Sequence, residues 1–309
     1  MKVFSGAAQI PEAAKGATIA MGAFDGLHLG HKALMRRAKN EAPNYPLGIL
    51  LFEPPPKLFF AKDRNSSRLA TERVTERLAD NIGVEVIFTV NFDDNLANMS
   101  AKDFISNVII SEIAPSHVVV GYDFRFGKGR SGDAFYLKDE LSKQGISVSI
   151  QEPILDIDGG RISSTRIREL IQNGEINEAN GLLGHAWLIE GIVEHGQKLG
   201  RELGYPTANL KLYEQVAPKF GIYAVKVDIG DRIMRHGVAN FGRTPTTGIR
   251  DALFEVHLLD WDGDLYSRNI LVEVHKFLRP EEKFASLEEL VVQIGKDAEN
   301  AREYFNENS

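Results

Sequence analysis

The chain has 309 residues, of which 43% are hydrophobic and 26% charged, and its formal net charge is −7. At about 150 residues per domain this length predicts two domains, and the acidic balance speaks against nucleic acid as a partner. The absence of cysteine excludes disulfides, thiolate metal sites and a cysteine nucleophile, and it fits the cytoplasm. No signal peptide is expected, and no apolar run approaches the roughly 20 residues that cross a membrane.

Through about residue 155, short apolar runs rich in β-forming residues alternate with helical stretches. The helical stretches are 31–42 and 70–83, the second with Thr71 as a candidate N-cap and Gly83 as a stop signal. This alternation predicts βαβ units, a mostly parallel sheet with helices on both faces, and ligand-binding loops at the carboxyl ends of the strands. The predicted strands are 17–24, 46–52, 84–90, 117–124 and 146–152.

The pattern changes near residue 185 to short alternating segments that predict an antiparallel sheet or barrel. Asp262-Gly263 is a strong hairpin signal. Short helices are expected over 171–186, and we place the domains at 1–184 and 185–309. A last helix begins at the capping-box pair Ser286 and Glu289, and its apolar stripe is expected to pack on the barrel: Leu287, Leu290, Ile294, Ala298, Ala301 and Phe305.

The segment GAFDGLHLGH, residues 22–31, joins the first predicted strand to the first helix. A glycine-rich turn at a helix N-terminus suits phosphate, because unpaired N–H groups and the helix dipole face the ligand. His28 and His31 lie three residues apart, which places both rings on one side of the first turn as donors to phosphoryl oxygens. A partial metal site or a solvated surface are the alternatives, and zinc would need a third ligand that the region does not offer.

Two further segments carry oxygen and guanidinium donors. In RISSTRIREL, residues 161–170, Ser164, Thr165 and Arg168 suit a triphosphate, although an ordinary helix cap with a surface arginine is the simpler interpretation. In GQKLGRELGYPTANL, residues 196–210, Thr207 and Asn209 are hard oxygen donors suited to magnesium and ATP phosphates. A turn that leads into a strand is the alternative for this segment.

Both halves resemble known families. GAFDGLHLGH is similar to the GxFDGxHxGH signature of prokaryotic FMN adenylyltransferases, and ISSTRIR matches their ISSTxxR segment. The PTAN, FEVHLLD and FLRPEEKF segments of the second half are similar to riboflavin kinase. The order of these motifs resembles the bifunctional riboflavin kinase/FMN adenylyltransferase family, the prokaryotic FAD synthetases, over nearly the whole chain.

The resemblance implies a Rossmann-like nucleotidyltransferase domain followed by an antiparallel β-barrel kinase domain with a C-terminal helix. It implies that riboflavin is phosphorylated to FMN in the barrel and that FMN is then adenylylated to FAD, with ATP as co-substrate and Mg²⁺ as cofactor. The implied catalytic residues are Glu255 as base, His28 and His31. The partners are then the small molecules riboflavin, FMN and ATP, with no nucleic acid and no membrane.

The other site residues that the resemblance implies fall into four groups. The ATP site of the adenylyltransferase would comprise Gly22, Phe24, Asp25, Gly26, Ser164, Thr165 and Arg168. Its flavin and nucleotide pocket would comprise Pro56, Asp123, Phe124, Phe126 and Arg161. The kinase would bind ATP through Gly200, Thr207 and Asn209, the last two also as metal ligands, and flavin through Arg279.

The chain departs from the family pattern at Leu51, Pro55, Thr244 and Ser267. These departures leave open a flavin-binding regulatory protein with the same fold and lost or partial turnover. Another HxGH nucleotidyltransferase or a class I aminoacyl-tRNA synthetase relative is a further alternative. The synthetase would require a KMSKS-like loop and a basic RNA-binding surface, whereas this chain has ISSTRIR and a net charge of −7. A product assay with riboflavin, ATP and magnesium separates these hypotheses.

Overall fold

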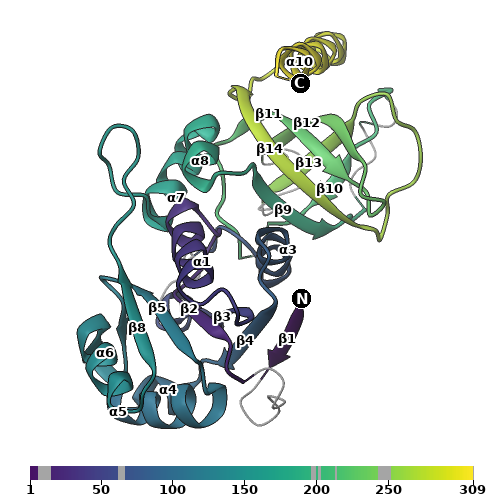
Figure 1. The fold of residues 1–309 in the computed structure, drawn as a ribbon. Helices are drawn as coiled ribbons and strands as arrows, with labels where there is room; N and C mark the ends of the chain where they lie inside the picture. Colours follow the sequence, from purple (N-terminus) through teal and green to yellow (C-terminus); the bar gives the residue numbers. More distant parts are fainter. Residues whose placement is uncertain are drawn as a thin grey trace. The chain divides into compact units, whose positions relative to one another are not determined.

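The computed structural model describes residues 1–5, 15–61, 67–195, 200, 203–212, 214–242 and 252–308 (Figure 1). The chain divides into two compact units. Unit 1 comprises Met1–Ser66 and Thr75–Ser163, and unit 2 comprises Ser67–Val74 and Ser164–Ser309. The predicted domain boundary between residues 184 and 185 stays a prediction. The division into compact units is a different one, since it assigns residues 164–183 to the second unit.

Unit 1 is built on a six-stranded sheet of order β1-β4-β3-β2-β5-β8, and every neighbouring pair is parallel. The five strands predicted from the sequence are all present, and an additional first strand forms one edge of the sheet. The predicted parallel α/β domain is therefore confirmed. The strands are β1 Lys2–Ser5, β2 Thr18–Met21, β3 Leu47–Glu53, β4 Val86–Asn91, β5 His117–Gly121 and β8 Ser147–Gln151.

Helices cover both faces of this sheet, as the alternating pattern predicts. On one face, Ile19 and Met21 belong to a buried cluster with residues of the π-helix and of α6. On the other face, the Thr18 hydroxyl donates to the carbonyl of Ala38 in α1 at 3.5 Å. The helices of this part of the chain are α1 Leu29–Glu41, α2 Pro56–Phe59, α3 Glu72–Ile82, α4 Asp94–Asn98, α5 Ala101–Asp103, the π-helix Phe104–Ile113 and α6 Ala134–Ser142.

The caps predicted for α3 are confirmed. The Thr71 hydroxyl accepts from the backbone N–H of Val74 at 3.3 Å, and Gly83 follows the helix with φ +89°. A left-handed residue at this place ends a helix because its N–H turns back to a carbonyl of the last turn. The Gly83 N–H donates to the Asp80 carbonyl at 3.0 Å.

The strand order reverses between β2 and β5. The chain leaves β2 toward β3 and β4 on one side, and β5 and β8 lie on the other side. In open parallel sheets ligands bind at such a switch point, outside the carboxyl ends of the two strands. The loops that begin at Gly22 and Tyr122 leave these two ends, so the fold places the GAFDGLHLGH segment at the predicted ligand-binding edge.

Unit 2 contains an antiparallel six-stranded sheet of order β10-β13-β12-β11-β14-β9. The N–H of Glu194, just beyond β9, donates to the Asn209 carbonyl of β10 at 2.9 Å, so the two edges meet and the curled sheet closes. The predicted antiparallel barrel with a C-terminal helix is therefore confirmed. The elements are α7 Ser164–Asn173, α8 Ile176–Leu183, β9 Trp187–Ile192, β10 Ala208–Leu210, β11 Gly221–Asp228, β12 Met234–Gly242, β13 Leu253–Leu258, β14 Asn269–Arg279 and α10 Leu287–Glu307.

The last helix packs on the barrel through its second half. Ala298, Ala301 and Phe305 form a buried cluster with residues of β11 and β12. Leu287 is 52% exposed, so the expectation that the whole stripe is buried was wrong at its first residue. The reason is that every buried residue of α10 lies at or beyond position 297, which leaves the first turns at the surface. Ser286 caps the helix by accepting from the N–H of Glu289 at 3.3 Å.

The hairpin predicted at Asp262-Gly263 was wrong. β13 and β14 are not neighbours, because β13 pairs with β10 and β12 while β14 pairs with β11 and β9. The intervening segment 259–268 is a crossing loop, in which Asp260 and Ser267 adopt left-handed φ values of +54° and +62°. The dipeptide marks a change of direction but does not specify which strands pair.

Replacing Ser267 by glycine is expected to stabilise unit 2 by about 0.5–1 kcal/mol. Glycine removes the cost of about 1–2 kcal/mol for a side chain in the left-handed region. Part of this gain is offset because glycine also raises the conformational entropy of the unfolded chain. Ser267 is exposed, so few contacts are lost. Chemical denaturation measures the change. Ser267→Ala keeps the Cβ and should give no gain, and equal stability of the two variants would contradict a backbone origin.

A short segment that precedes α3 belongs to unit 2. Arg68 forms a parallel bridge with Gln215, in which the Arg68 N–H donates to the Glu214 carbonyl at 2.8 Å. The Leu69 carbonyl accepts from Trp187 Nε1 at 2.9 Å and from Gln215 Nε2 at 3.3 Å. Two side chains of the barrel unit therefore bind the backbone of residues 67–70.

Candidate active sites

The loop after β2 adopts an unusual backbone. Phe24 and Leu27 have φ values of +46° and +42°, Gly26 has +81°, and both apolar side chains are fully buried. Left-handed backbone at a residue other than glycine costs about 1–2 kcal/mol, and such residues cluster at functional sites. Gly22 begins this loop and Asp25 lies half-buried in it. The burial of Phe24 and Leu27 holds the strained loop in place.

His28 caps the helix that follows. The sequence pattern starts the helix at His31, but α1 begins at Leu29, and Nδ1 of His28 accepts from the N–H of His31 at 3.4 Å. An imidazole that accepts at Nδ1 carries its proton on Nε2, which makes Nε2–H a hydrogen-bond donor. A Cβ at Gly30 would lie only 3.1 Å from Nδ1 and Cε1 of the His28 ring, so glycine leaves room for the ring.

The two histidine rings stack, as their spacing predicts. Their centroids lie 3.6 Å apart with an interplanar angle of 15°, and Phe24 contacts the His31 ring with centroids 5.2 Å apart. Burial, and to a smaller extent the neighbouring His28, lowers the pKa of His31 well below its ordinary value, so the ring is neutral at pH 7. Its buried Nδ1 has no hydrogen-bond partner among the described residues. The His31 ring is therefore a neutral imidazole, stacked on the ring of His28.

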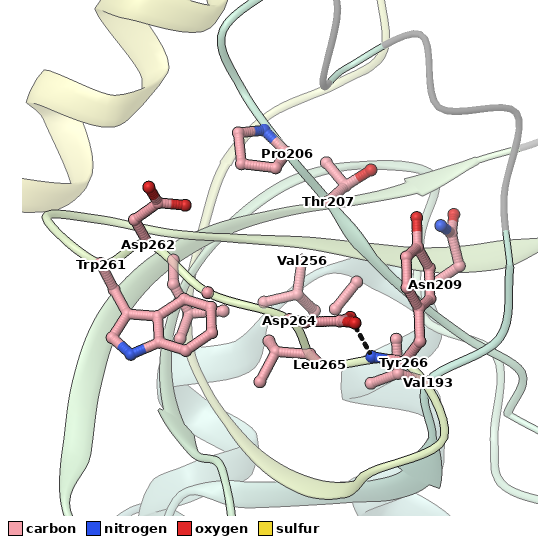
Figure 2. Close-up of a pocket in the computed structure, with 13 residues that line it drawn as sticks. Val193, Pro206, Thr207, Asn209, Val256, Trp261, Asp262, Asp264, Leu265 and Tyr266 are labelled. Atoms are coloured by element: carbon pink, nitrogen blue, oxygen red, sulfur yellow. Dashed lines mark hydrogen bonds between the residues drawn. The ribbon is translucent and has the colours of Figure 1, made fainter.

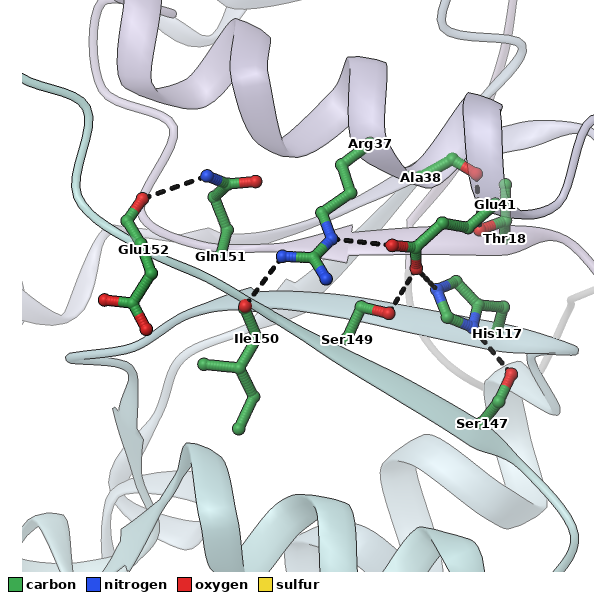
Figure 3. Close-up of polar contacts among 10 residues, drawn as sticks. All are labelled: Thr18, Arg37, Ala38, Glu41, His117, Ser147, Ser149, Ile150, Gln151 and Glu152. Atoms are coloured by element: carbon green, nitrogen blue, oxygen red, sulfur yellow. Dashed lines mark hydrogen bonds and ion pairs between the residues drawn. The ribbon is translucent and has the colours of Figure 1, made fainter.

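A polar network fixes the other end of α1 to the sheet (Figure 3). Glu41 pairs with Arg37 at 2.7 Å and with Nε2 of His117 at 3.1 Å, and it accepts from the Ser149 hydroxyl. Nδ1 of His117 lies 2.6 Å from the Ser147 hydroxyl. Burial by itself would raise the pKa of Glu41, but the hydrogen bonds from Ser149 and Arg37 outweigh it and hold this pKa below its ordinary value. The helix that carries the histidines is thus tied to β5 and β8.

The loop after β5 places the predicted pocket residues of unit 1. Arg161 and Asp123 form an ion pair, and the Arg161 guanidinium lies 5.5 Å from the centroid of the Tyr122 ring. The rings of Phe124 and Phe126 stack at 5.6 Å. Phe126 is a core residue, 7% exposed, while Phe124 packs against that core from a partly buried position.

Aromatic side chains missed by the sequence analysis extend this group. Phe104 contacts both Phe126 and Phe52, and the rings continue through Phe92 to Phe59 and Phe60, with neighbouring centroids 5.1–6.1 Å apart. Phe52 lies at the end of β3, and α2, which begins at Pro56, follows it. Phe60 is 62% exposed. A series of aromatic rings therefore runs from the core at Phe104 and Phe126 to the exposed ring of Phe60.

The ISSTRIR residues lie at the start of α7. Ser164 and Thr165 are the first residues of the helix, and Thr165 is exposed. The Nε of Arg168 donates to the Ser67 carbonyl at 2.8 Å, which orients the guanidinium. Hydroxyls at a helix N-terminus and an oriented guanidinium suit an anionic ligand.

Thr207 and Asn209 line one pocket of the barrel (Figure 2). The crossing loop 259–268 supplies the other side, including Trp261, Asp264 and Tyr266. The Gly200 carbonyl accepts from the N–H of Tyr205 at 2.7 Å, which places Gly200 against the segment that leads to Thr207. Residues 196–199 and 201–202 of the motif and Thr244 lie outside the described residues.

Glu255 does not itself line this pocket, but it belongs to a row of side chains across the sheet that includes the pocket residue Asn209. It is paired in register with Asn209 on β10 and with Asn240 on β12. Directly opposed residues of neighbouring strands point to the same face, so the two asparagines flank the carboxylate. Burial, and then the nearby Glu281, raises the pKa of Glu255. A shielded carboxylate next to hydrogen-bonding amides is suited to accept a proton from a hydroxyl.

Arg279 is held by the C-terminal helix. Its Nε and Nη2 donate to the two carboxylate oxygens of Asp297 at 2.7 and 2.6 Å, and its Nη1 donates to the Pro280 carbonyl at 2.9 Å. Gln293 also donates to Asp297 at 3.0 Å. The sequence alone gave no signal for this pairing, because the partners come from different elements. The guanidinium is thus oriented before any ligand binds.

The fold and the two sites define a class of transferases with a nucleotidyltransferase-like α/β unit and a barrel unit that carries the partly buried carboxylate of Glu255. A family model described as FAD synthetase matches residues 10–166, and one described as riboflavin kinase matches residues 183–305. The chain belongs to the bifunctional riboflavin kinase/FMN adenylyltransferase family.

Relatives that carry this family name are similar over the whole chain. The proteins of Escherichia coli K12 and Bacillus subtilis are 41% and 35% identical, covering 99% and 93% of this chain and 98% and 92% of their own lengths. A solved structure titled macrolide-efflux protein from Streptococcus pneumoniae is 31% identical with a TM-score of 0.86, covering 97% of this chain and 98% of its own. In the described part of the chain, no helix has the length and apolar character needed to cross a membrane.

Proposed function

We propose that the chain makes FAD from riboflavin in two ATP-dependent steps. The barrel transfers the γ-phosphoryl group of ATP to the 5′-hydroxyl of riboflavin, giving FMN and ADP. The α/β unit then joins FMN to the α-phosphate of a second ATP, giving FAD and pyrophosphate. The observation that carries the proposal is the register of Glu255 between Asn240 and Asn209, since Asn209 also lines the pocket with Thr207.

In the kinase step, Glu255 takes the proton of the ribityl 5′-hydroxyl as its oxygen attacks the γ-phosphorus and ADP leaves. The raised pKa of Glu255 makes it a stronger base than an ordinary carboxylate when ionised. Asn209 and Thr207 orient the nucleotide. A Cβ at Gly200 would lie 2.5 Å from the Tyr205 carbonyl oxygen, so glycine lets the backbone pack against the segment that leads to Thr207. The positioning of two reactants accounts for much of the catalysis of such a transfer.

The donor set around Thr207 fits Mg²⁺, because hydroxyl and amide oxygens are hard ligands and this ion usually completes its shell with phosphate oxygens and water. Both residues line the same pocket. We propose that Thr207 and Asn209 hold the ion, which would neutralise charge on the ATP phosphates when bound. No group of three or more histidine, cysteine, aspartate or glutamate side chains suited to a metal occurs among the described residues.

In the adenylyl step the FMN phosphate is already a nucleophile, so the protein supplies position and charge stabilisation. We assign phosphate donation to Nε2–H of His28 and to the neutral ring of His31, whose buried Nδ1 lacks a protein partner in the described structure. The other ATP ligands in the proposal are Gly22, Phe24, Asp25, Gly26, Ser164, Thr165 and Arg168.

The flavin of this second reaction would contact the aromatic edge of the sheet. Phe124 would face the isoalloxazine ring and Phe126 would support it from the core, which agrees with their exposures. Pro56 and the aromatic series that ends at Phe60 extend the apolar surface, and flat rings stack favourably on such surfaces. Asp123 and Arg161 would then supply polar contacts. The flavin-binding role of Arg279 in the kinase site remains part of the proposal.

Replacing His28 by alanine is expected to reduce FAD production from FMN by about 10²-fold or more, the usual loss when a donor to a developing charge is removed. FMN production from riboflavin should be unchanged, since the barrel supplies its own ATP site. Chromatographic separation of flavins after incubation with either substrate measures both rates. Equal loss of FMN and FAD would contradict separate sites.

The wild-type chain tests the whole proposal. Incubation with riboflavin, ATP and Mg²⁺ should yield FMN and then FAD, and incubation with FMN should yield FAD directly. Bound but unchanged riboflavin would favour the regulatory alternative, and no flavin interaction would overturn the proposal.

The use of ATP and the absence of cysteine support the cytoplasm as the place of action.

A further inference from the structure

Asn240 lies next to the proposed base of the kinase and was not singled out by the sequence. β12 and β13 pair it directly with Glu255, and β10 and β13 pair Asn209 with the other side of Glu255. Opposed side chains on neighbouring strands have Cβ atoms about 4.5–5.5 Å apart on one face. Asn240 is thus within the reach of any group that contacts Glu255.

The amide of Asn240 is held in one orientation. Its side chain hydrogen-bonds to the Glu281 carboxylate, and only the amide nitrogen can donate to a carboxylate. The other end, Oδ1, is buried and has no hydrogen-bond partner among the described residues. A buried acceptor without a donor is unfavourable, so a ligand donor at this point would stabilise the complex.

Glu281 is placed by the absence of a side chain at Gly242. A Cβ at position 242 would overlap the Glu281 carboxylate, so glycine creates the space that the carboxylate occupies. Arg279, a basic residue close to Glu281 in sequence, uses its Nε and Nη2 donors to bind Asp297 and not Glu281. Glu281 also adds to the raised pKa of Glu255, which shows that the two carboxylates lie close together.

Around the reacting group, the protein therefore presents three acceptors, namely Asn240 Oδ1 and the Glu255 and Glu281 carboxylates. Of the two proposed kinase substrates, riboflavin brings a flexible chain of hydroxyl donors to this place. We propose that Asn240 and Glu281 accept hydrogen bonds from hydroxyls of the ribityl chain and so determine which hydroxyl reaches Glu255. This inference rests on the proposed role of Glu255, and it makes both residues positioning residues for the flavin substrate.

Asn240→Ala and Glu281→Gln test the inference. Each is expected to raise the KM for riboflavin about tenfold, since one hydrogen bond to a buried or charged acceptor corresponds to about 1.4 kcal/mol. Lumiflavin, which has the same ring system without the ribityl chain, should inhibit the variants and the wild type equally. The KM for ATP and the conversion of FMN to FAD should not change.

Asn269→Ala is the matched control, because Asn269 lies at the start of β14 and donates to Glu190 at 2.8 Å. It should leave the KM for riboflavin unchanged. Residue 281 lies outside the strands, and Glu281→Gln keeps the size of the side chain, so this variant should fold. It therefore tests the inference even if Asn240→Ala folds poorly. An unchanged riboflavin KM, or an equal shift for lumiflavin, would overturn the inference. Failure of the proposed base role would appear separately, as phosphorylation retained by Glu255→Gln.

Discussion

Replacing Glu255 by glutamine should reduce phosphorylation of riboflavin by about 10²- to 10⁴-fold, the range typical of a lost general base. The amide keeps the size of the side chain and can still hydrogen-bond between Asn209 and Asn240, so the register of the row should persist. It cannot take the proton of the 5′-hydroxyl. Initial rates of FMN formation under saturating riboflavin and ATP measure the effect.

Conversion of supplied FMN to FAD is the internal control for this variant. It should proceed at the wild-type rate, because none of the residues proposed for adenylyl transfer lies in the barrel strands. Riboflavin phosphorylation at the wild-type rate would show that Glu255 is not the base. Parallel loss of both activities would indicate a folding defect instead of a lost proton acceptor.

Replacing Asp297 by alanine should destabilise unit 2 by about 3–5 kcal/mol, because it removes the buried carboxylate that binds Arg279 and leaves, among the described residues, only the exposed Glu282, 3.9 Å from Nη1. Asp297 is 3% exposed and accepts three hydrogen bonds, two from Arg279 and one from Gln293. Denaturation followed by tryptophan fluorescence reports on this unit, since the two tryptophans of the chain, Trp187 and Trp261, both belong to it.

Asp260→Asn is the matched control for Asp297→Ala, because asparagine, like aspartate, tolerates the left-handed φ of +54° at this position. Asp260 also pairs with an arginine of α10, Arg302, at 2.9 Å, but its side chain is 78% exposed. Solvent screens such a pair and allows both partners to be hydrated separately, so its loss should hardly move the denaturation midpoint. Similar midpoints for the two variants would show that the buried pair does not hold α10 on the barrel.

Features of the fold that depend on local spacing could be predicted from the sequence. The strand and helix alternation gives the parallel sheet, and the three-residue spacing of His28 and His31 gives ring proximity on one helical turn. The cap of α3 also follows from its residues alone. Each of these relations involves neighbours along the chain, so residue type and spacing determine them.

Relations between distant strands could not be predicted in this way. Asn240 becomes a site residue only through the pairing of β12 with β13, and Glu281 only because Gly242 leaves space for it. Asp262-Gly263 failed as a hairpin signal for the same reason, since turn residues do not specify the pairing partner. The role of Glu255 came from family resemblance, which the register with Asn209 now supports.

The short segment at residues 67–70 has a consequence for how the protein can be divided. A fragment that begins at residue 185 would lack the Leu69 carbonyl, and the buried donors of Trp187 and Gln215 would lose that acceptor. It would also lack the Ser67 carbonyl and the arginine that binds it. The two family segments are consecutive in sequence, but the compact unit that contains the barrel is discontinuous, so a single cut does not separate the two units cleanly.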